Sequence, residues 1–204
     1  MHRLLLVLLL LMAATTGFAQ EAKSPVRLAA LSMEIFQEGL ATKTPRLFLW
    51  AAQLRKQANL VPQNPEKGAF DFDMFSWRDM LWEAEKYARS RAKLAGGIQM
   101  LLDERPRGVV DGAIYSRSKL LPHSKKTHTT LNFEGGVFAE AYVEALEEAD
   151  IALFIYDSQG ALVCSQTNAG PIAECNWLPE HDEEFSIVIE NNSETIAKYA
   201  LMTN

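Results

Sequence analysis

Residues 150–160 read Asp-Ile-Ala-Leu-Phe-Ile-Tyr-Asp-Ser-Gln-Gly, and they decide the fold class of the second half of the chain. The apolar run 151–156 is short, rich in aromatic and β-branched side chains, and bounded by aspartates, which is typical of a strand buried on both faces. Residues 157–160 have the composition of a tight turn, with Gly160 where a left-handed conformation is required. The stretch therefore predicts a strand and the turn of a β-hairpin.

Other segments of the second half also have the pattern of strands separated by turn residues. They are residues 127–133, 161–165, 185–189 and 196–203. Residues 137–150 have high helix propensity, which by itself favours a helix, but their apolar residues also alternate. We predict a strand because strands flank the segment on both sides and because of the family resemblance described below. About seven or eight short strands with polar turns indicate an antiparallel β-sandwich.

The first half has the pattern of helices. Ser24-Pro25 and Thr44-Pro45 each place a capping residue before a proline, which is a helix start. Apolar residues follow at helical spacing, and Gly39 is expected to end the first helix. We expect a third and longest helix from about residue 76 to residue 94, stopped by Gly96-Gly97, with a short helix over 98–103. Residues 62–68 are expected to form a loop because they contain two prolines and a glycine.

The beginning of the chain has the pattern of a cleavable secretory signal over residues 1–19. Residues 2–3 are basic, residues 4–12 are an unbroken apolar run, and Gly17 and Ala19 are small. The apolar run is about nine residues long, whereas a membrane-spanning helix needs about 20. We therefore expect cleavage near Ala19/Gln20, a periplasmic or secreted mature protein, and no later transmembrane segment.

These patterns predict an α+β fold, in which a helical N-terminal unit precedes the antiparallel, jelly-roll-like β-sandwich. The expected division is a signal peptide at 1–19, a helical unit at 20–107 and a β-sandwich domain at 108–204. The boundary is expected near residues 105–108 or within the loop at 122–126.

Charge is distributed unevenly between the two halves. Counting Lys and Arg against Asp and Glu gives about +3 for residues 20–107 and about −10 for residues 108–204. Phosphate binding requires clustered cations, so the acidic half is not expected to bind nucleic acid. Plain solubility outside the cell is the alternative explanation for the charge.

The only cysteines of the chain, Cys164 and Cys175, both lie in the acidic half. An exported protein meets an oxidising environment, so we predict that they form a disulfide, which stabilises the fold by about 3 kcal/mol. A reactive or metal-binding thiol is the alternative, but neither a CxxC pair nor a nearby histidine supports it.

Four motifs of the second half occur in a recognisable order. They are Phe133-Glu134-Gly135-Gly136, the stretch 150–160, Trp177-Leu178-Pro179 and the segment 199–204. Together they resemble the bacterial pre-peptidase C-terminal domains of secreted peptidases, over about residues 127–204. The resemblance implies a jelly-roll-like sandwich of two antiparallel sheets, and a non-catalytic role in binding, localisation or stabilisation.

The resemblance also implies a calcium site, because some related modules bind calcium near the strand at 151–156. Glu148, Asp150 and Asp157 are the candidate ligands, whereas alanines occupy positions 149 and 152, where further ligands would be expected. Calcium requires six to eight oxygen ligands. A solvated acidic turn is the alternative, and no cofactor is assigned beyond this calcium candidate.

The sequence lacks common catalytic motifs, since it has no G-x-S-x-G and no HExxH motif. His123 and His128 do not have the spacing of a helical zinc pair, and His181 is expected in a solvated turn. Glu140 and Glu144 could share one face of a strand, although we expect them to be exposed on an edge strand. Carboxylate pairs depend on separation in space, so an enzyme stays an alternative.

The main hypothesis is an exported, non-catalytic binding protein with an unidentified protein or glycan partner. One alternative is a hydrolase that acts on an extracellular or envelope substrate through carboxylates. A second alternative is an oligomeric structural component of the envelope.

Overall fold

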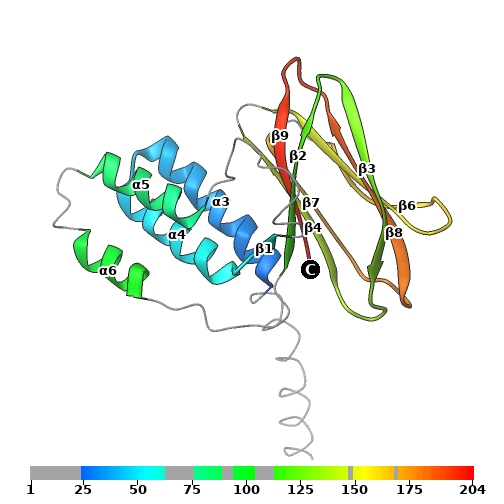
Figure 1. The fold of residues 1–204 in the computed structure, drawn as a ribbon, viewed down its shortest axis with the longest axis horizontal. Helices are drawn as coiled ribbons and strands as arrows, with labels where there is room; N and C mark the ends of the chain where they lie inside the picture. The colour runs from blue at the N-terminus through cyan, green and yellow to red at the C-terminus, as the bar shows by residue number, and fades with distance from the viewer. Residues whose placement is uncertain (1–23, 63–75, 89–93, 104–112, 147–148, 168–169) are drawn as a thin grey trace, which may run out of the picture. The chain divides into compact units, whose positions relative to one another are not determined.

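The computed structural model describes the whole chain except residues 1–23, 63–75, 89–93, 104–112, 147–148 and 168–169 (Figure 1). The predicted signal peptide and the predicted boundary at 105–108 therefore lie outside the described residues. The chain divides into two compact units. The first contains Met1–Ala58 and Trp77–Pro106, and the second contains Asn59–Ser76 and Arg107–Asn204.

The first unit is helical. Its described helices are α3 (Pro25–Thr42), α4 (Pro45–Ala58), α5 (Trp77–Tyr87) and α6 (Ala95–Asp103). The Ser24 hydroxyl accepts a hydrogen bond from the Arg27 backbone N–H at 3.3 Å, and proline occupies the first position of both α3 and α4. The two predicted helix starts are therefore confirmed.

Gly39 does not end the first helix, contrary to our prediction. Helix α3 continues to Thr42, and the chain turns away at Lys43, which has a left-handed conformation with φ of 53°. A Cβ atom at Gly39 would lie 2.9 Å from Cε1 of Phe48. The glycine therefore permits close packing of α3 against α4, a requirement that the local sequence does not reveal.

The predicted long third helix is also wrong. Helix α5 ends at Tyr87, and Gly96-Gly97 lie in the first turn of α6 instead of stopping a helix. A Cβ atom at Gly97 would lie 3.1 Å from Cδ1 of Leu49, so the absence of a side chain allows α6 to approach α4. Helix α3 is the longest helix in the described part of the chain.

The second unit is a sandwich of two sheets. Its strands are β1 (Val61–Pro62), β2 (Ile114–Leu120), β3 (Ser124–Phe133), β4 (Ala139–Ala145), β5 (Ile151–Tyr156), β6 (Leu162–Gln166), β7 (Ile172–Trp177), β8 (Glu183–Asn191) and β9 (Ala197–Thr203). One sheet, sheet A, has the order β1-β2-β9-β4-β7, and the other, sheet B, has the order β3-β8-β5-β6.

From β2 onward, the strands pair from the outside of the sequence inward. Strand β2 pairs with β9, β3 with β8, β4 with β7 and β5 with β6, all antiparallel. This is a long hairpin whose paired strands alternate between the two sheets, which is the jelly-roll arrangement. The predicted fold class is therefore confirmed.

Strand β1 was not predicted. Val61 pairs with Ile114 in parallel, and the Val61 backbone N–H donates to the Ala113 carbonyl at 3.0 Å. We had predicted a loop over 62–68 and a helical unit over all of 20–107. The chain enters the sandwich at β1, returns to the helical unit and re-enters the sandwich at β2. Pro62 is tolerated because β1 is a short edge strand.

The ambiguous segment 137–150 contains a strand, as predicted. Strand β4 lies between β9 and β7, and all of its residues are buried. Ala139, Ala141, Val143 and Ala145 face the core together with Ile151, Leu153 and Ile155 of β5, and Ile187 and Ile189 of β8. Tertiary burial therefore overrides the helix propensity of this segment.

Candidate functional site

Three turns of the sandwich lie at the same end. They connect β3 to β4 (134–138), β5 to β6 (157–161) and β7 to β8 (178–182). The remaining turns, from β2 to β3, β4 to β5, β6 to β7 and β8 to β9, lie at the opposite end, because the chain reverses direction at each strand. Figure 1 shows the β2–β3 and β8–β9 turns at the top of the sandwich. We call the first end the three-turn end.

The motif glycines hold two of these turns together. The Gly136 N–H donates to the Pro179 carbonyl at 2.8 Å, and the Gly135 N–H donates to Oδ1 of Asp182 at 2.9 Å. Gly136 has a φ of 74°, which favours glycine. A Cβ atom on Gly135 would lie only 2.3 Å from Cα of His181. The Phe-Glu-Gly-Gly and Trp-Leu-Pro motifs therefore form one rigid joint.

Three aromatic rings fill the core beneath this joint. The Phe133 and Trp177 ring centroids are 4.8 Å apart, and Phe185 lies 5.8 Å from Phe133 and 5.4 Å from Trp177. All three side chains are buried. Because the turns rest on a packed aromatic cluster, the residues that they display are held in place.

The joint displays three exposed apolar side chains, Val137, Phe138 and Leu178, which we call the apolar patch. Their exposed fractions are 47%, 64% and 52%. Ala139 of β4 pairs with Trp177 of β7, so Phe138 and Leu178 lie opposite one another just beyond the strand ladder. Single exposed apolar residues are ordinary, but adjacent ones on a rigid surface are typical of interaction sites.

The side chain of Asn204 braces the strand beside the patch. Its Nδ2 donates to the Phe138 carbonyl at 2.7 Å, and its Oδ1 accepts from the Glu140 N–H at 2.9 Å. The backbone of Phe138 is therefore held from both sides, by Asn204 and by the Gly-Gly turn.

The end of the sandwich that displays the apolar patch also carries acidic residues. The three turns and the first residues of β8 carry Glu134, Asp157, Glu180, Asp182, Glu183 and Glu184. The sequence has no lysine or arginine between Lys126 and Lys198, so none of these turns contains a cation. The three-turn end is thus an apolar patch with an acidic rim.

The cations of the sandwich lie toward the opposite end. All lysines and arginines of residues 108–204 are on β2, β3 or β9, namely Arg117, Lys119, Lys125, Lys126 and Lys198. Lys119 and Lys198 are direct cross-strand partners, although like charges in this position repel. The three turns of the three-turn end therefore carry carboxylates without cations, whereas the opposite end carries both signs, including Glu190 at 4.0 Å from Lys125.

A polar cluster closes the side of the sandwich where β2 and β3 face each other. Lys126 Nζ donates to the Ser118 hydroxyl at 2.8 Å, and His128 Nε2 lies 3.2 Å from the Tyr199 hydroxyl. Burial raises the pKa of Tyr199 to about 12, despite an opposing hydrogen bond with Ser118. Burial, together with the nearby Lys126 charge, lowers the pKa of His128 to about 4. His128 is thus neutral at pH 7, and the cluster links sheets A and B.

Acidification is expected to destabilise the sandwich through His128. The unfolded chain binds this proton near pH 6.5, but the folded protein binds it only near pH 4. The free energy of unfolding therefore has its full value above about pH 6.5. It falls by about 1–2 kcal/mol between pH 6.5 and 4, after allowance for the partial exposure of the His128 side chain. Urea unfolding of His128→Gln should show a smaller loss over this range than wild type. His181→Gln, at an exposed histidine, should match wild type, and equal losses in all three proteins would contradict the assignment.

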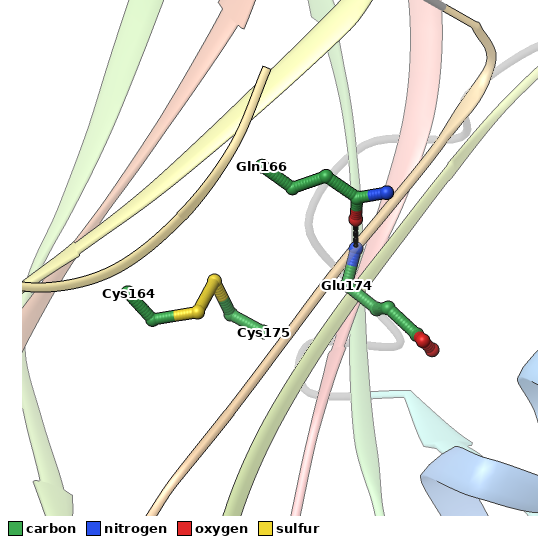
Figure 2. The surroundings of a disulfide bond; sticks show 4 residues. All are labelled: Cys164, Gln166, Glu174 and Cys175. Carbon is green, nitrogen blue, oxygen red and sulfur yellow. Dashed lines mark hydrogen bonds between the residues drawn. A yellow bond between two sulfur atoms is a disulfide. The ribbon is translucent and has the colours of Figure 1, made fainter. Parts of the chain in front are cut away.

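The opposite side of the sandwich is closed by the predicted disulfide. Cys164 of β6 bonds to Cys175 of β7, with Cα atoms 6.0 Å apart, and thereby joins the edge strands of the two sheets. Figure 2 shows the adjacent hydrogen bond from the Glu174 N–H to the side-chain oxygen of Gln166. The pairing of the two cysteines is confirmed, and the thiol alternative is excluded.

Removal of the disulfide is expected to lower the free energy of unfolding by about 3 kcal/mol, because the unfolded chain regains the entropy of the open loop. The double variant Cys164→Ala/Cys175→Ala, compared with wild type by urea unfolding, measures this loss. Reductant should destabilise wild type and leave the variant unchanged. Equal stability of the two proteins without reductant would contradict the prediction.

The structure does not bring the calcium candidates together. Glu148 lies outside the described residues, while Asp150 precedes β5 and Asp157 follows it. A strand of this length separates its ends by about 20 Å, whereas calcium ligands lie about 2.4 Å from one ion. Oδ1 of Asp157 instead accepts from the N–H groups of Gln159 and Ala161, and so stabilises the hairpin turn.

Glu140 and Glu144 share one face of β4. Contrary to our prediction, they are not exposed on an edge strand. Strand β4 is a central strand of sheet A, and both side chains are buried. About 13 Å of extended strand separates them. Carboxylate pairs of glycosidases lie about 5–9.5 Å apart, so this spacing does not match that chemistry.

His123 and His181 both lie in turns. His123 Nε2 lies 3.1 Å from a Glu194 carboxylate oxygen, and His181 contributes backbone to the joint with Gly135. Among the described residues, no three His, Cys, Asp or Glu side chains gather in a way that could hold a metal ion. In the part of the chain that the structure describes, no helix combines the length and the apolar character that crossing a bilayer requires.

The apolar patch was not predicted from the sequence. The signal was available, because Val137 and Phe138 directly follow a Gly-Gly turn and Leu178 directly precedes a proline. It could not show that the two segments meet, since that depends on the pairing of β4 with β7.

No protein-family model matches the chain, and no curated protein matches it. Among solved structures, the chain is similar to the pre-peptidase C-terminal domain of a collagenase from Bacillus anthracis, with 11% identity and a TM-score of 0.39 over 44% of this chain and 87% of that chain. This is a domain of the kind that the motifs of the second half resemble.

Two further structures are similar at the same level. A mitogen derived from Yersinia pseudotuberculosis has 13% identity and a TM-score of 0.34, over 46% of this chain and 85% of that chain. A periplasmic inhibitor of g-type lysozyme from Aeromonas hydrophila has 8% identity and a TM-score of 0.35, over 45% of this chain and 84% of that chain. These likenesses concern the fold alone.

Proposed function

We propose that this chain is an exported, non-catalytic binding protein that contacts a protein partner through the apolar patch. The observation that carries the proposal is the rigid display of Val137, Phe138 and Leu178 at the three-turn end. Exposed apolar groups on a pre-organised surface lose little conformational entropy on binding, so most of their burial contributes to affinity.

The roles of the polar side chains support a non-catalytic protein. His128 and Tyr199 link the two sheets, Asp157 stabilises a hairpin turn, and the two cysteines close an edge. Each of these groups makes a contact that supports the fold. Export is supported by the disulfide, since such bonds persist in oxidising compartments.

The proposal is tested with the double variant Phe138→Ser/Leu178→Ser. Its matched control is Ile196→Ser, an apolar residue of similar exposure, 48%, in the turn between β8 and β9 at the opposite end. Each mature, tagged protein is used to capture proteins from the envelope and extracellular fractions of its own source. We expect one stoichiometric partner to be retained by wild type and by Ile196→Ser, but not by the double variant. Equal retention by all three proteins would refute the role of the patch.

Self-association is the alternative use of an apolar patch. Sedimentation of purified wild type over a hundredfold concentration range separates the two cases. We expect a constant monomer mass. A mass that rises with concentration in wild type, and stays monomeric in Phe138→Ser/Leu178→Ser, would refute the proposal and favour an oligomeric envelope component.

A further inference from the structure

We infer that the partner of the apolar patch is a cationic protein surface, attracted to the three-turn end by its acidic rim. This inference rests on the proposed function, because it names the chemistry of the partner at the same patch. The positions of the charged residues in the sandwich indicate the charge of the partner, which the apolar patch alone does not indicate.

The acidic rim lies on the same turns as the apolar patch or at the start of the adjoining β8. Glu134 lies three residues before Val137, and Glu180 lies two residues after Leu178. Phe133 pairs with Glu183, so Glu134 and the start of β8 lie on adjoining strand ends. Glu134, Glu180 and Glu184 are all exposed. A partner that covers the three-turn end therefore faces these carboxylates as well as Phe138 and Leu178.

The three turns carry carboxylates and no lysine or arginine, and this makes the three-turn end selective. The cations lie toward the end of the sandwich that carries the β2–β3 turn. Strand β8 alone spans about 30 Å, which is several times the Debye length of about 8 Å at physiological ionic strength. The end with the β2–β3 turn also carries Asp150, Glu190 and Glu194, so it presents both signs of charge. The three turns present carboxylates alone, and a cationic partner is therefore attracted more strongly to the three-turn end.

The same rim disfavours other occupants of the patch. Phosphate backbones and anionic lipid surfaces are repelled by clustered carboxylates, because both bind through cations. A neutral glycan would gain no charge attraction from the rim. A surface with apolar side chains between lysines or arginines matches both the patch and its surroundings.

The first experiment uses peptides as probes, since they separate charge from apolar contact. One peptide is an amphipathic helix of Leu and Lys, the second replaces Lys with Glu, and the third replaces Leu with Ser. Binding to the mature chain is measured by fluorescence anisotropy at low and at high salt. We expect only the Leu/Lys peptide to bind, with an affinity that falls about tenfold or more as salt rises.

Two variants test whether the Leu/Lys peptide binds at the three-turn end. The triple variant Glu134→Gln/Glu180→Gln/Glu184→Gln and the double variant Phe138→Ser/Leu178→Ser should each weaken binding of the Leu/Lys peptide about tenfold. The matched control, Glu190→Gln/Glu194→Gln, removes exposed and half-exposed carboxylates near the opposite end and should bind as wild type does. Equal weakening in the control, or equal binding of the Leu/Lys and Leu/Glu peptides, would overturn the inference.

The triple variant also distinguishes failure of this inference from failure of the proposed function. If the captured partner depends on Phe138 and Leu178 but not on the three glutamates, the patch is the binding surface and its partner is not cationic. If capture depends on neither set of residues, the proposed function fails as well.

Discussion

Replacement of Asn191 by aspartate is expected to lower the free energy of unfolding by about 4 kcal/mol. Asn191 is 1% exposed, and its Nδ2 donates to the carbonyl oxygens of Leu121 at 3.0 Å, Thr195 at 2.8 Å and Leu120 at 3.4 Å. Its Oδ1 accepts from the N–H and the hydroxyl of Ser193. Aspartate would place a charged oxygen against these carbonyls where a donor is required.

Urea unfolding at pH 7 measures this effect. The control is Asn192→Asp, since the neighbouring side chain is exposed and its substitution should change stability by less than about 0.5 kcal/mol. Comparable stability of Asn191→Asp and wild type would mean that the amide does not hold the two turns together. The same burial has a second consequence: although residues 191–193 form an N-glycosylation sequon, the acceptor amide is inside the fold.

Gly135→Ala is expected to destabilise the sandwich by about 4 kcal/mol, combining overpacking with the loss of two hydrogen bonds. The added Cβ would lie 2.3 Å from Cα and 2.5 Å from C of His181, and 2.8 Å from N of Asp182. These are backbone atoms, so the two turns must move apart. Their separation would break the bonds of Gly135 to Asp182 and of Gly136 to Pro179.

Gly160→Ala tests whether steric contact or backbone conformation causes the loss of stability expected for Gly135→Ala. Gly160 has a φ of 81° but nothing within 4 Å of its Cβ position, so the substitution should cost only about 1–2 kcal/mol. Thermal or urea unfolding compares the two variants directly. If Gly135→Ala were no worse than Gly160→Ala, close packing of the turns would not explain the Gly-Gly motif. Gly135→Ala should also weaken partner capture, because the apolar patch spans both turns.

A strand could be predicted from its own residues only where those residues did not suit a helix or a loop as well. Strand β5 was predicted over its whole length, because a short apolar run between aspartates allows little else. Strand β4 needed its neighbours, since its alanines and glutamates suit a helix as well. Strands β2 and β7 were not identified, because several of their residues are polar and their alternation is weak.

The wrong predictions in the helical unit concern glycines that were expected to end helices. Gly39 and Gly97 have the local appearance of helix breakers, but each lies within a helix at a close approach to another helix. The partners of these contacts, Phe48 and Leu49, lie on α4. No local pattern distinguishes a glycine that ends a helix from one that lets another helix approach.

The sequence by itself determined the class of the fold, the starts of α3 and α4, the hairpin turn at Gly160 and the identity of the disulfide partners. Each of these depends on residues close together in the chain or, for the cysteines, on there being only two. Only the tertiary structure decided that the Gly-Gly turn meets the 178–182 turn, and that three turns with carboxylates and no lysine or arginine lie at one end of the sandwich. Pairing of strands that are distant in sequence sets these positions, and that pairing is chosen by burial of the whole core.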